Sequence, residues 1–192
     1  QSIDLIKTTR KEMDLRDINS IKKIILKHRP DWIINTAAIT GVDILESQKH
    51  LAMLVNAEAP KVLSDSMQKI GGRVLQISTD YVFDGNQFVP YKPTDKVNPL
   101  NIYGLSKSYA ENYVLKSPNN LVLRTSWVYS QRGNNFLKTI LSLTAKSIQE
   151  KKPIRIVSDQ YSSPTSTKSL AKFCWEIIKN NILKKLEKRI LH

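Results

Sequence analysis

Residues 73–80 read Arg-Val-Leu-Gln-Ile-Ser-Thr-Asp, and this stretch decides the fold class. It begins with a largely apolar run that is typical of a buried parallel strand. It ends in three polar residues, Ser78, Thr79 and Asp80, where such a strand would reach its carboxyl end. Ligands of open parallel sheets bind past the carboxyl ends of the strands. We therefore predict a strand within residues 73–82 whose polar end faces a ligand.

Helical and extended patterns alternate on both sides of this strand. Further strands are predicted over residues 3–8, 31–36, 121–129 and 154–157, and helices over residues 18–28, 46–70, 103–115, 136–147 and 170–183. A bend or restart is expected at Pro60, inside the second of these helices. Residues 84–100 form a long loop, and long ordered loops in compact domains are usually functional. The alternation predicts an α/β fold with a doubly wound, mostly parallel sheet.

The composition is that of a globular protein, with one anomaly in its charge. The chain has 41% hydrophobic and 24% charged residues and a net charge of +13. The basic residues are scattered and no zinc-finger or RNA-binding motif accompanies them, so neither nucleic acid nor a membrane is an expected partner. A lone cysteine, Cys174, in an apolar helical setting is typical of a reducing compartment, and we expect a cytoplasmic location. The histidines lack metal-ligand spacing, so no metal site is assigned.

Tyr103 and Lys107 lie four residues apart in a predicted helix, which places both side chains on one helical face. A free tyrosine has a pKa near ~10 and is a poor acid or base at neutral pH, but an adjacent ammonium group stabilises its phenolate. Such a pair suits proton exchange with a carbonyl or an alcohol. The spacing alone is common by chance, so other groups must support this interpretation.

The Thr79 hydroxyl supplies that support. It ends a strand one loop earlier in the chain, where it would be able to hydrogen-bond the same carbonyl oxygen and polarise it. The alternative is that Ser78, Thr79 and Asp80 only form a capping or turn cluster. If the Thr79 hydroxyl does polarise the carbonyl, the candidate catalytic residues of a carbonyl-reducing or carbonyl-handling enzyme are Tyr103, Lys107 and Thr79.

Several motifs along nearly the whole chain resemble those of the extended short-chain dehydrogenase/reductases. They include Ser-Thr-Asp-Tyr-Val-Phe-Asp-Gly at 78–85, Tyr-Gly-Leu-Ser-Lys at 103–107 and Arg-Thr-Ser-Trp-Val-Tyr at 124–129, with further matches at 35–43, 55–58, 133–136 and 159–165. The resemblance implies an NAD(P)-binding Rossmann-like domain over residues 1–192, with segments near 130–165 contributing to a small substrate lobe. It also implies reduction of the 4-keto group of a thymidine-diphosphate sugar such as dTDP-4-dehydrorhamnose by NADPH or NADH, in the synthesis of rhamnose and polysaccharide precursors.

The resemblance further implies a role for individual residues. Tyr103 would donate the proton to the 4-keto oxygen, Lys107 would bind the nicotinamide ribose and lower the pKa of the tyrosine, and Thr79 would polarise the carbonyl. Asp80 and Trp127 would contact the substrate, with a core position as the alternative for Trp127. The implied cofactor-binding residues are Asp14 and Leu15 at the adenine, Ala37, Ala38, Ile39 and Thr40 along the dinucleotide, and Tyr103 and Lys107. The resemblance also allows a homodimer and a magnesium ion, for which the sequence offers no identifiable ligands.

A phosphate-binding glycine cluster is missing from this sequence. Dinucleotide-binding folds need closely spaced glycines between the first strand and the first helix, because the backbone must nearly touch the pyrophosphate. No three of the six glycines have that spacing. Compared with the family, the chain is expected to start after the first strand-turn-helix unit and to stop within the C-terminal substrate lobe. We expect residues 1–192 alone to bind a dinucleotide weakly and to lack activity by themselves.

Two other functions use the same fold. A nucleotide-sugar epimerase or dehydratase shares the tyrosine and lysine but resembles this chain less at residues 78–85 and at Trp127, and epimerases regenerate their cofactor. A non-catalytic regulatory subunit is the second alternative, because a regulatory protein of human methionine adenosyltransferase is similar to the same reductases. The presence of Thr79, Tyr103, Lys107 and Trp127 together favours catalysis.

Overall fold

A parallel sheet forms the centre of the computed structural model, which describes residues 3–156, 158–180, 186 and 189–192. Its strands are β1 (Trp32–Asn35), β2 (Arg73–Thr79), β3 (Leu121–Thr125) and β6 (Ile190–Leu191), in the order β1-β2-β3-β6 with parallel neighbours. Beyond this sheet, β4 (Val128–Tyr129) pairs with β5 (Thr165–Ser166). The predicted parallel α/β architecture is confirmed, and the carboxyl ends of β1, β2 and β3 share one edge.

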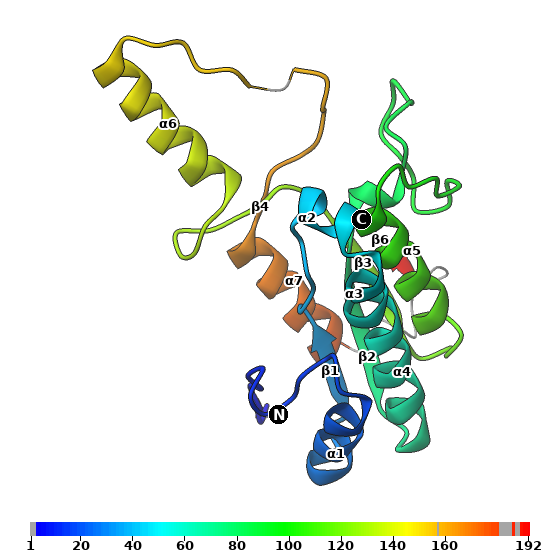
Figure 1. The fold of residues 1–192 in the computed structure, drawn as a ribbon. Coiled ribbons are helices and arrows are strands. Elements are labelled where there is room, and N and C mark those ends of the chain that lie inside the picture. Colours follow the sequence, from blue (N-terminus) through cyan, green and yellow to red (C-terminus); the bar gives the residue numbers. More distant parts are fainter. Residues whose placement is uncertain (1–2, 157, 181–185, 187–188) are drawn as a thin grey trace.

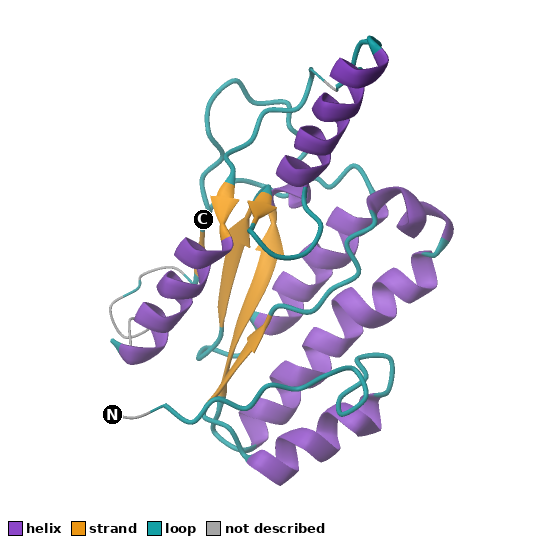
Figure 2. Ribbon diagram, turned by 90° about the vertical axis from the view of Figure 1, so that its left-hand side faces the viewer, coloured by secondary structure: helices purple, strands orange, loops and turns teal. Residues whose placement is uncertain are grey.

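Helices cover both faces of the sheet (Figures 1 and 2). α1 (Ile18–His28), α4 (Ala59–Lys69) and α5 (Ile102–Val114) lie on one face, over a core that includes Ile25 and Leu63. α7 (Thr167–Lys179) covers the other face, where its Cys174 and Ile177 pack against Leu75. A fully buried Leu or Ile side chain contributes roughly 1.5–3 kcal/mol, so these two clusters hold the sheet between its helices.

The predicted helix over residues 46–70 is a series of shorter helices. α2 (Val42–Ser47) and α3 (Lys49–Met53) precede a π-helical turn, η1 (Leu54–Glu58), which α4 follows. Pro60 is the second residue of α4, in the first turn, where a missing backbone N–H is tolerated. The irregular turn therefore lies before the proline and buries Asn56. Short π-helical turns are frequent at functional sites.

Two of the predicted strands are wrong. Residues 3–8 form no strand, and the side chains of Ile3, Leu5 and Ile6 are exposed. Residues 154–156 also form no strand, while Val157 lies outside the described residues. Both stretches have the apolar pattern of a strand, but a strand also needs a hydrogen-bonded neighbour, and the described residues provide none there. The predicted helix over residues 170–183 begins earlier, at Thr167, and its last residues lie outside the described part.

α6 (Phe136–Glu150) projects from the sheet and its helical layers (Figure 1). None of its residues is buried, and Leu137, Leu141 and Ile148 are among its exposed apolar side chains. Residues 130–165 therefore stand apart from the sheet core. Throughout the described part of the chain, no helix has both the length and the apolar character needed to cross a membrane.

Candidate active site

The beginning of α5 lies directly against the end of β2. The Asn101 side chain caps the helix, accepting a hydrogen bond of 2.7 Å from the Gly104 N–H. A Cβ atom on Gly104 would lie only 2.0 Å from the carbonyl oxygen of Tyr81, in the 3-10 turn η2 (Asp80–Val82) that follows β2. Glycine at this position therefore allows the close approach, which brings Tyr103 beside Thr79 and Tyr81.

Tyr103 is partly buried beside two residues of the β2 end. Its ring packs edge-on against the ring of Tyr81, with 5.7 Å between the centroids. Burial raises the pKa of Tyr103 above its ordinary value, a hydrogen bond with Thr79 opposes this rise, and the charge of Asp80 adds to it. The phenol is therefore protonated at neutral pH, as a proton donor must be. We had expected Lys107 to lower this pKa, but in the structure the pKa moves the other way.

Lys107 lies one turn further along α5 and is only 3% exposed. Its ammonium group donates a hydrogen bond of 2.6 Å to the carbonyl oxygen of Ile77 in β2. Burial lowers the pKa of Lys107 to about 8, while the nearby carboxylate of Glu111 acts in the opposite direction. The charge of Lys107 is thus directed at the strand backbone, which explains why it does not act on the Tyr103 phenol.

The Thr79 hydroxyl takes part in both arrangements that the sequence allowed. It accepts a hydrogen bond of 3.2 Å from the Tyr81 N–H and so caps η2, and it donates one of 3.2 Å to the Asp80 carboxylate. It also acts on the Tyr103 phenol, whose pKa it lowers. The Asp80 carboxylate accepts a further hydrogen bond of 2.7 Å from Ser162, which ties the segment before β5 to this site. Capping and a catalytic position are therefore compatible at Thr79.

The segment Ala37–Thr40 follows the carboxyl end of β1, at the same edge of the sheet. Asn56 in η1 fixes this segment through the backbone of Ile39, accepting 2.8 Å from its N–H and donating 2.9 Å to its carbonyl oxygen. The same amide donates 3.2 Å to Ser106 of α5. Asn56 thus connects the predicted cofactor segment to the helix of Tyr103. We did not predict this role, because residues 46–70 read as one regular helix.

Three other predicted binding residues lie outside the cluster around Tyr103. They are Leu15, Asp14 and Trp127. Leu15 is buried in the core cluster that also includes Ile39, so its side chain is used for packing. Asp14 pairs with Arg16, whose Nε lies 3.0 Å from both carboxylate oxygens, and this contact holds the pKa of Asp14 well below its usual range. Trp127 is partly exposed rather than buried in the core, with a left-handed φ of 42°. Non-glycine residues in this conformation store strain and cluster at functional sites.

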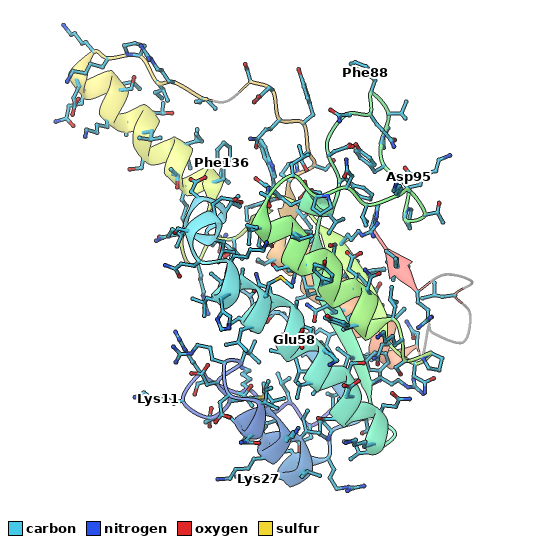
Figure 3. The ribbon with its side chains drawn as sticks, turned by 45° about the vertical axis from the view of Figure 1, so that its right-hand side comes forward. Lys11, Lys27, Glu58, Phe88, Asp95 and Phe136 are labelled. Carbon is cyan, nitrogen blue, oxygen red and sulfur yellow. The ribbon has the colours of Figure 1, made fainter. Side chains whose placement is uncertain are left out.

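The environment of Trp127 belongs to the projecting part of the chain. Its ring lies 4.9 Å from the ring of Phe136, at the end of α6 nearest the sheet (Figure 3). Its carbonyl oxygen accepts a hydrogen bond of 3.2 Å from the Thr165 N–H, next to the pairing of β4 with β5. Trp127 therefore joins the sheet to residues 130–165.

The long loop over residues 84–100 is folded back on itself (Figure 3, where Phe88 and Asp95 mark it). The Asp84 carboxylate accepts hydrogen bonds of 2.6 Å from the Tyr91 hydroxyl and 3.0 Å from the Asn98 amide. These contacts hold the pKa of Asp84 far below its ordinary value. The loop is thereby ordered between the Thr79 end of β2 and the start of α5.

A metal ion would need several acidic, histidine or cysteine side chains close together. Among residues 3–156, 158–180, 186 and 189–192, no group of three or more His, Cys, Asp or Glu side chains is placed to hold a metal ion. The magnesium ion that the resemblance allowed has no ligand set in this part of the chain.

Comparison with known proteins identifies the family of the chain. The family described as the RmlD substrate binding domain matches residues 1–192. The chain belongs to this family. The chain is 39% identical over 159 residues to the dTDP-4-dehydrorhamnose reductase of Salmonella typhimurium. The matched residues are 82% of this chain and 52% of that protein. The predicted reductase resemblance is confirmed.

Solved structures of the same kind share the fold. A dTDP-4-dehydrorhamnose reductase from Clostridium acetobutylicum superposes with a TM-score of 0.85 at 37% identity, covering 91% of this chain and 61% of that one. The enzyme from Bacillus anthracis, solved in complex with NADP, gives a TM-score of 0.84 at 34% identity and covers 92% of this chain and 62% of that one. The Rossmann-like fold is confirmed. The chain spans about half the length of the curated relatives it matches.

Proposed function

We propose that the whole protein reduces the 4-keto group of a dTDP-4-dehydro-6-deoxy sugar, converting dTDP-4-dehydrorhamnose to dTDP-rhamnose with NADPH or NADH. The observation that carries this proposal is the convergence of Tyr103, Thr79 and Lys107 at the carboxyl edge of the sheet. The names of the relatives supply the substrate, and the complex of the Bacillus anthracis enzyme with NADP supports the cofactor.

The residues at this edge fit the nicotinamide half of a dinucleotide. Ala37 and Ala38 have small side chains that let a flat ligand approach the backbone, and Asn56 holds the adjoining Ile39 in place. Lys107 would bind the ribose hydroxyls, and Asp14 and Leu15 would lie at the adenine end. When bound, the cofactor supplies the hydride for carbon 4 of the sugar.

The proton for the carbonyl oxygen comes from Tyr103. Burial keeps its phenol protonated at neutral pH, so it is ready to act as an acid. The Thr79 hydroxyl, which acts on the same phenol, would polarise the carbonyl and stabilise the negative charge that develops on its oxygen. Hydride addition to carbon and proton transfer to oxygen give the alcohol, and the Tyr103 phenolate regains its proton from solvent. Asp80, Trp127 and residues 130–165 would contact the sugar nucleotide.

The test is to assay Tyr103→Phe in the whole protein for oxidation of NADPH or NADH that depends on dTDP-4-dehydrorhamnose. Removing the proton donor should lower kcat roughly 100- to 10,000-fold with little change in stability. Tyr109→Phe is the matched control, because Tyr109 lies on the same helix but is 41% exposed. Full activity in Tyr103→Phe would contradict the mechanism.

Product analysis separates the proposal from its alternatives. A reductase oxidises one cofactor for each sugar reduced, whereas an epimerase changes the sugar with no net oxidation. A protein that binds the ligands without any turnover would be a regulatory subunit. A homodimer and a cytoplasmic location also remain predictions, for which sedimentation velocity and cell fractionation are the measurements.

A further inference from the structure

A buried carboxylate lies directly behind the proposed catalytic pair. Tyr103, Lys107 and Glu111 follow one another at intervals of four residues, so they form a stripe along one face of α5. Glu111 is only 3% exposed, and its partner Arg124 in β3 is 5% exposed. Neither residue has a role in the proposed chemistry. Two opposite charges this deeply buried need an explanation, because burying ions is costly.

The contacts of Glu111 join three elements of the fold. Arg124 binds its carboxylate in a bidentate manner, with Nε 2.9 Å from Oε1 and Nη2 2.6 Å from Oε2. The hydroxyl of Ser78 donates a hydrogen bond of 2.6 Å to Oε1. Ser78 and Arg124 are register partners in β2 and β3. Glu111 therefore fastens the ends of two neighbouring strands to α5.

Ser78 lies between the two residues of β2 that serve the site. The carbonyl oxygen of the preceding residue, Ile77, holds the Lys107 ammonium group at 2.6 Å. The following residue, Thr79, supplies the hydroxyl that lowers the pKa of the Tyr103 phenol. A displacement of the Ser78 backbone would therefore move both groups. The bond from Ser78 to Glu111 fixes that backbone from the helix side.

We propose that Glu111, together with Arg124, is a positioning residue of the reductase site. Through Ser78 it holds two groups of β2 in place. These are the Ile77 carbonyl, which faces Lys107, and the Thr79 hydroxyl, which faces Tyr103. This inference rests on the proposed function. Stability alone does not account for the pair, because apolar residues of similar volume in place of a buried ion pair are often equally or more stable. Apolar residues would neither accept the Ser78 bond nor place a negative charge near Lys107.

The electrostatic effect on Lys107 gives the inference a separate readout. The charged group that acts on Lys107 is Glu111 on its own helix, and Glu111 is itself paired with Arg124 on β3. Glu111 raises the pKa of Lys107 against the effect of burial. Without the carboxylate, the pKa of Lys107 should fall further, and the ammonium form should be lost at a lower pH.

The experiment compares Glu111→Gln, the double variant Glu111→Met/Arg124→Met, and Glu176→Gln in the whole protein. Glu176 pairs with Lys172 on the outer face of α7, away from the proposed binding residues, and serves as the control. Thermal unfolding, kcat, KM, and the titration of Lys107 by nitrogen-15 lysine NMR are measured for each. We expect Glu111→Gln to lower kcat at least tenfold and to shift the Lys107 titration to lower pH, with Glu176→Gln unchanged.

The double variant decides between positioning and a purely structural role. It removes both charges together, so it should recover thermal stability relative to Glu111→Gln while kcat stays low. Wild-type kcat in a stable double variant would overturn the inference. An unchanged Lys107 titration in Glu111→Gln would also overturn it, whatever the activity. Absence of any reductase activity in the unmodified protein would instead contradict the proposed function, and the Lys107 titration would still test the inference.

Discussion

The charge of Lys107 changes with pH in the range where an enzyme would be assayed. Burial lowers its pKa from 10.5 to about 8, so its folded-state pKa is depressed relative to the unfolded chain. Burial of the ammonium charge therefore disfavours folding most below pH 8, and this effect fades as the pH rises toward the unfolded value. The ammonium form, which we propose binds the ribose, is lost over the same rise in pH. As the pH rises above about 8, the free energy of unfolding should therefore increase while the affinity for the cofactor decreases.

The affinity of the whole protein for NADPH should accordingly fall above about pH 8. Isothermal titration calorimetry between pH 6.5 and 9.5 measures the dissociation constant. This constant should rise with pH along the curve of a single ionisation. Lys107→Met should bind more weakly and lose this pH dependence. Lys116→Met is the control, because Lys116 is exposed just beyond the end of α5. A pH dependence that persists in Lys107→Met would assign the ionisation to another group.

The residues that sequence reasoning found and missed differ in what makes them recognisable. Tyr103, Lys107 and Thr79 belong to local motifs, so spacing and strand position were enough to select them. Glu111 and Asn56 act through contacts that are 13 to 50 residues away in sequence, to Arg124 and Ser106. On a predicted helix a glutamate is ordinarily a surface residue. The repeated interval of four residues from Tyr103 to Glu111 was the one available signal.

The position of α5 is tightly constrained at Gly104. A Cβ on Gly104 would approach the Tyr81 carbonyl oxygen to 2.0 Å and the Tyr81 carbonyl carbon to 2.8 Å. Both are backbone atoms of η2, which cannot rotate away as a side chain would. The contact fixes how deeply the Tyr103 end of α5 sits against the end of β2.

Gly104→Ala should therefore destabilise the protein although alanine favours helices. Overpacking typically lowers the free energy of unfolding by about 1–3 kcal/mol, whereas the gain in helix propensity is about 1 kcal/mol. We expect a net loss of stability in urea unfolding together with lower kcat, because α5 must move away from Thr79. Asn112→Ala, on the exposed face of the same helix, should change stability by no more than ~0.5 kcal/mol. Wild-type stability and activity in Gly104→Ala would contradict this prediction, because they would show that the η2 backbone moves at little cost.

Helix and strand boundaries could be predicted where local sequence sets them, and not where distant contacts do. The predicted helix at 18–28 is confirmed, and the one at 103–115 is displaced by one residue, to Ile102–Val114. Both have local caps, from the Asp17 and Asn101 side chains. The predicted strand at 3–8 failed because pairing depends on a neighbouring strand. The π-helical turn was missed because the burial of Asn56 between Ile39 and Ser106 depends on tertiary contacts.

At the scale of the whole molecule, the positive charge is the feature that the proposed site explains least directly. Residues 1–192 carry a net charge of +13. Within the described part, several carboxylates are already paired, as in the bonds of Asp14 to Arg16 and of Glu111 to Arg124. The remaining basic side chains therefore produce a positive field. Both proposed ligands, a dinucleotide and a nucleotide sugar, carry a negatively charged pyrophosphate. A positive field raises the rate at which such ligands reach the protein.

The association rate constant of NADPH should therefore fall several-fold between low and physiological ionic strength. Screening lengths are about 30 Å at 0.01 M salt and about 8 Å at 0.15 M, so the field of the whole surface is felt only at low salt. Stopped-flow fluorescence at these two concentrations measures the rate, with sucrose at matched osmolality as the control. A rate that does not change with salt would rule out steering. Duplex DNA should be tested in parallel, because salt-dependent DNA binding that persists at 0.15 M would assign the charge to nucleic acid instead.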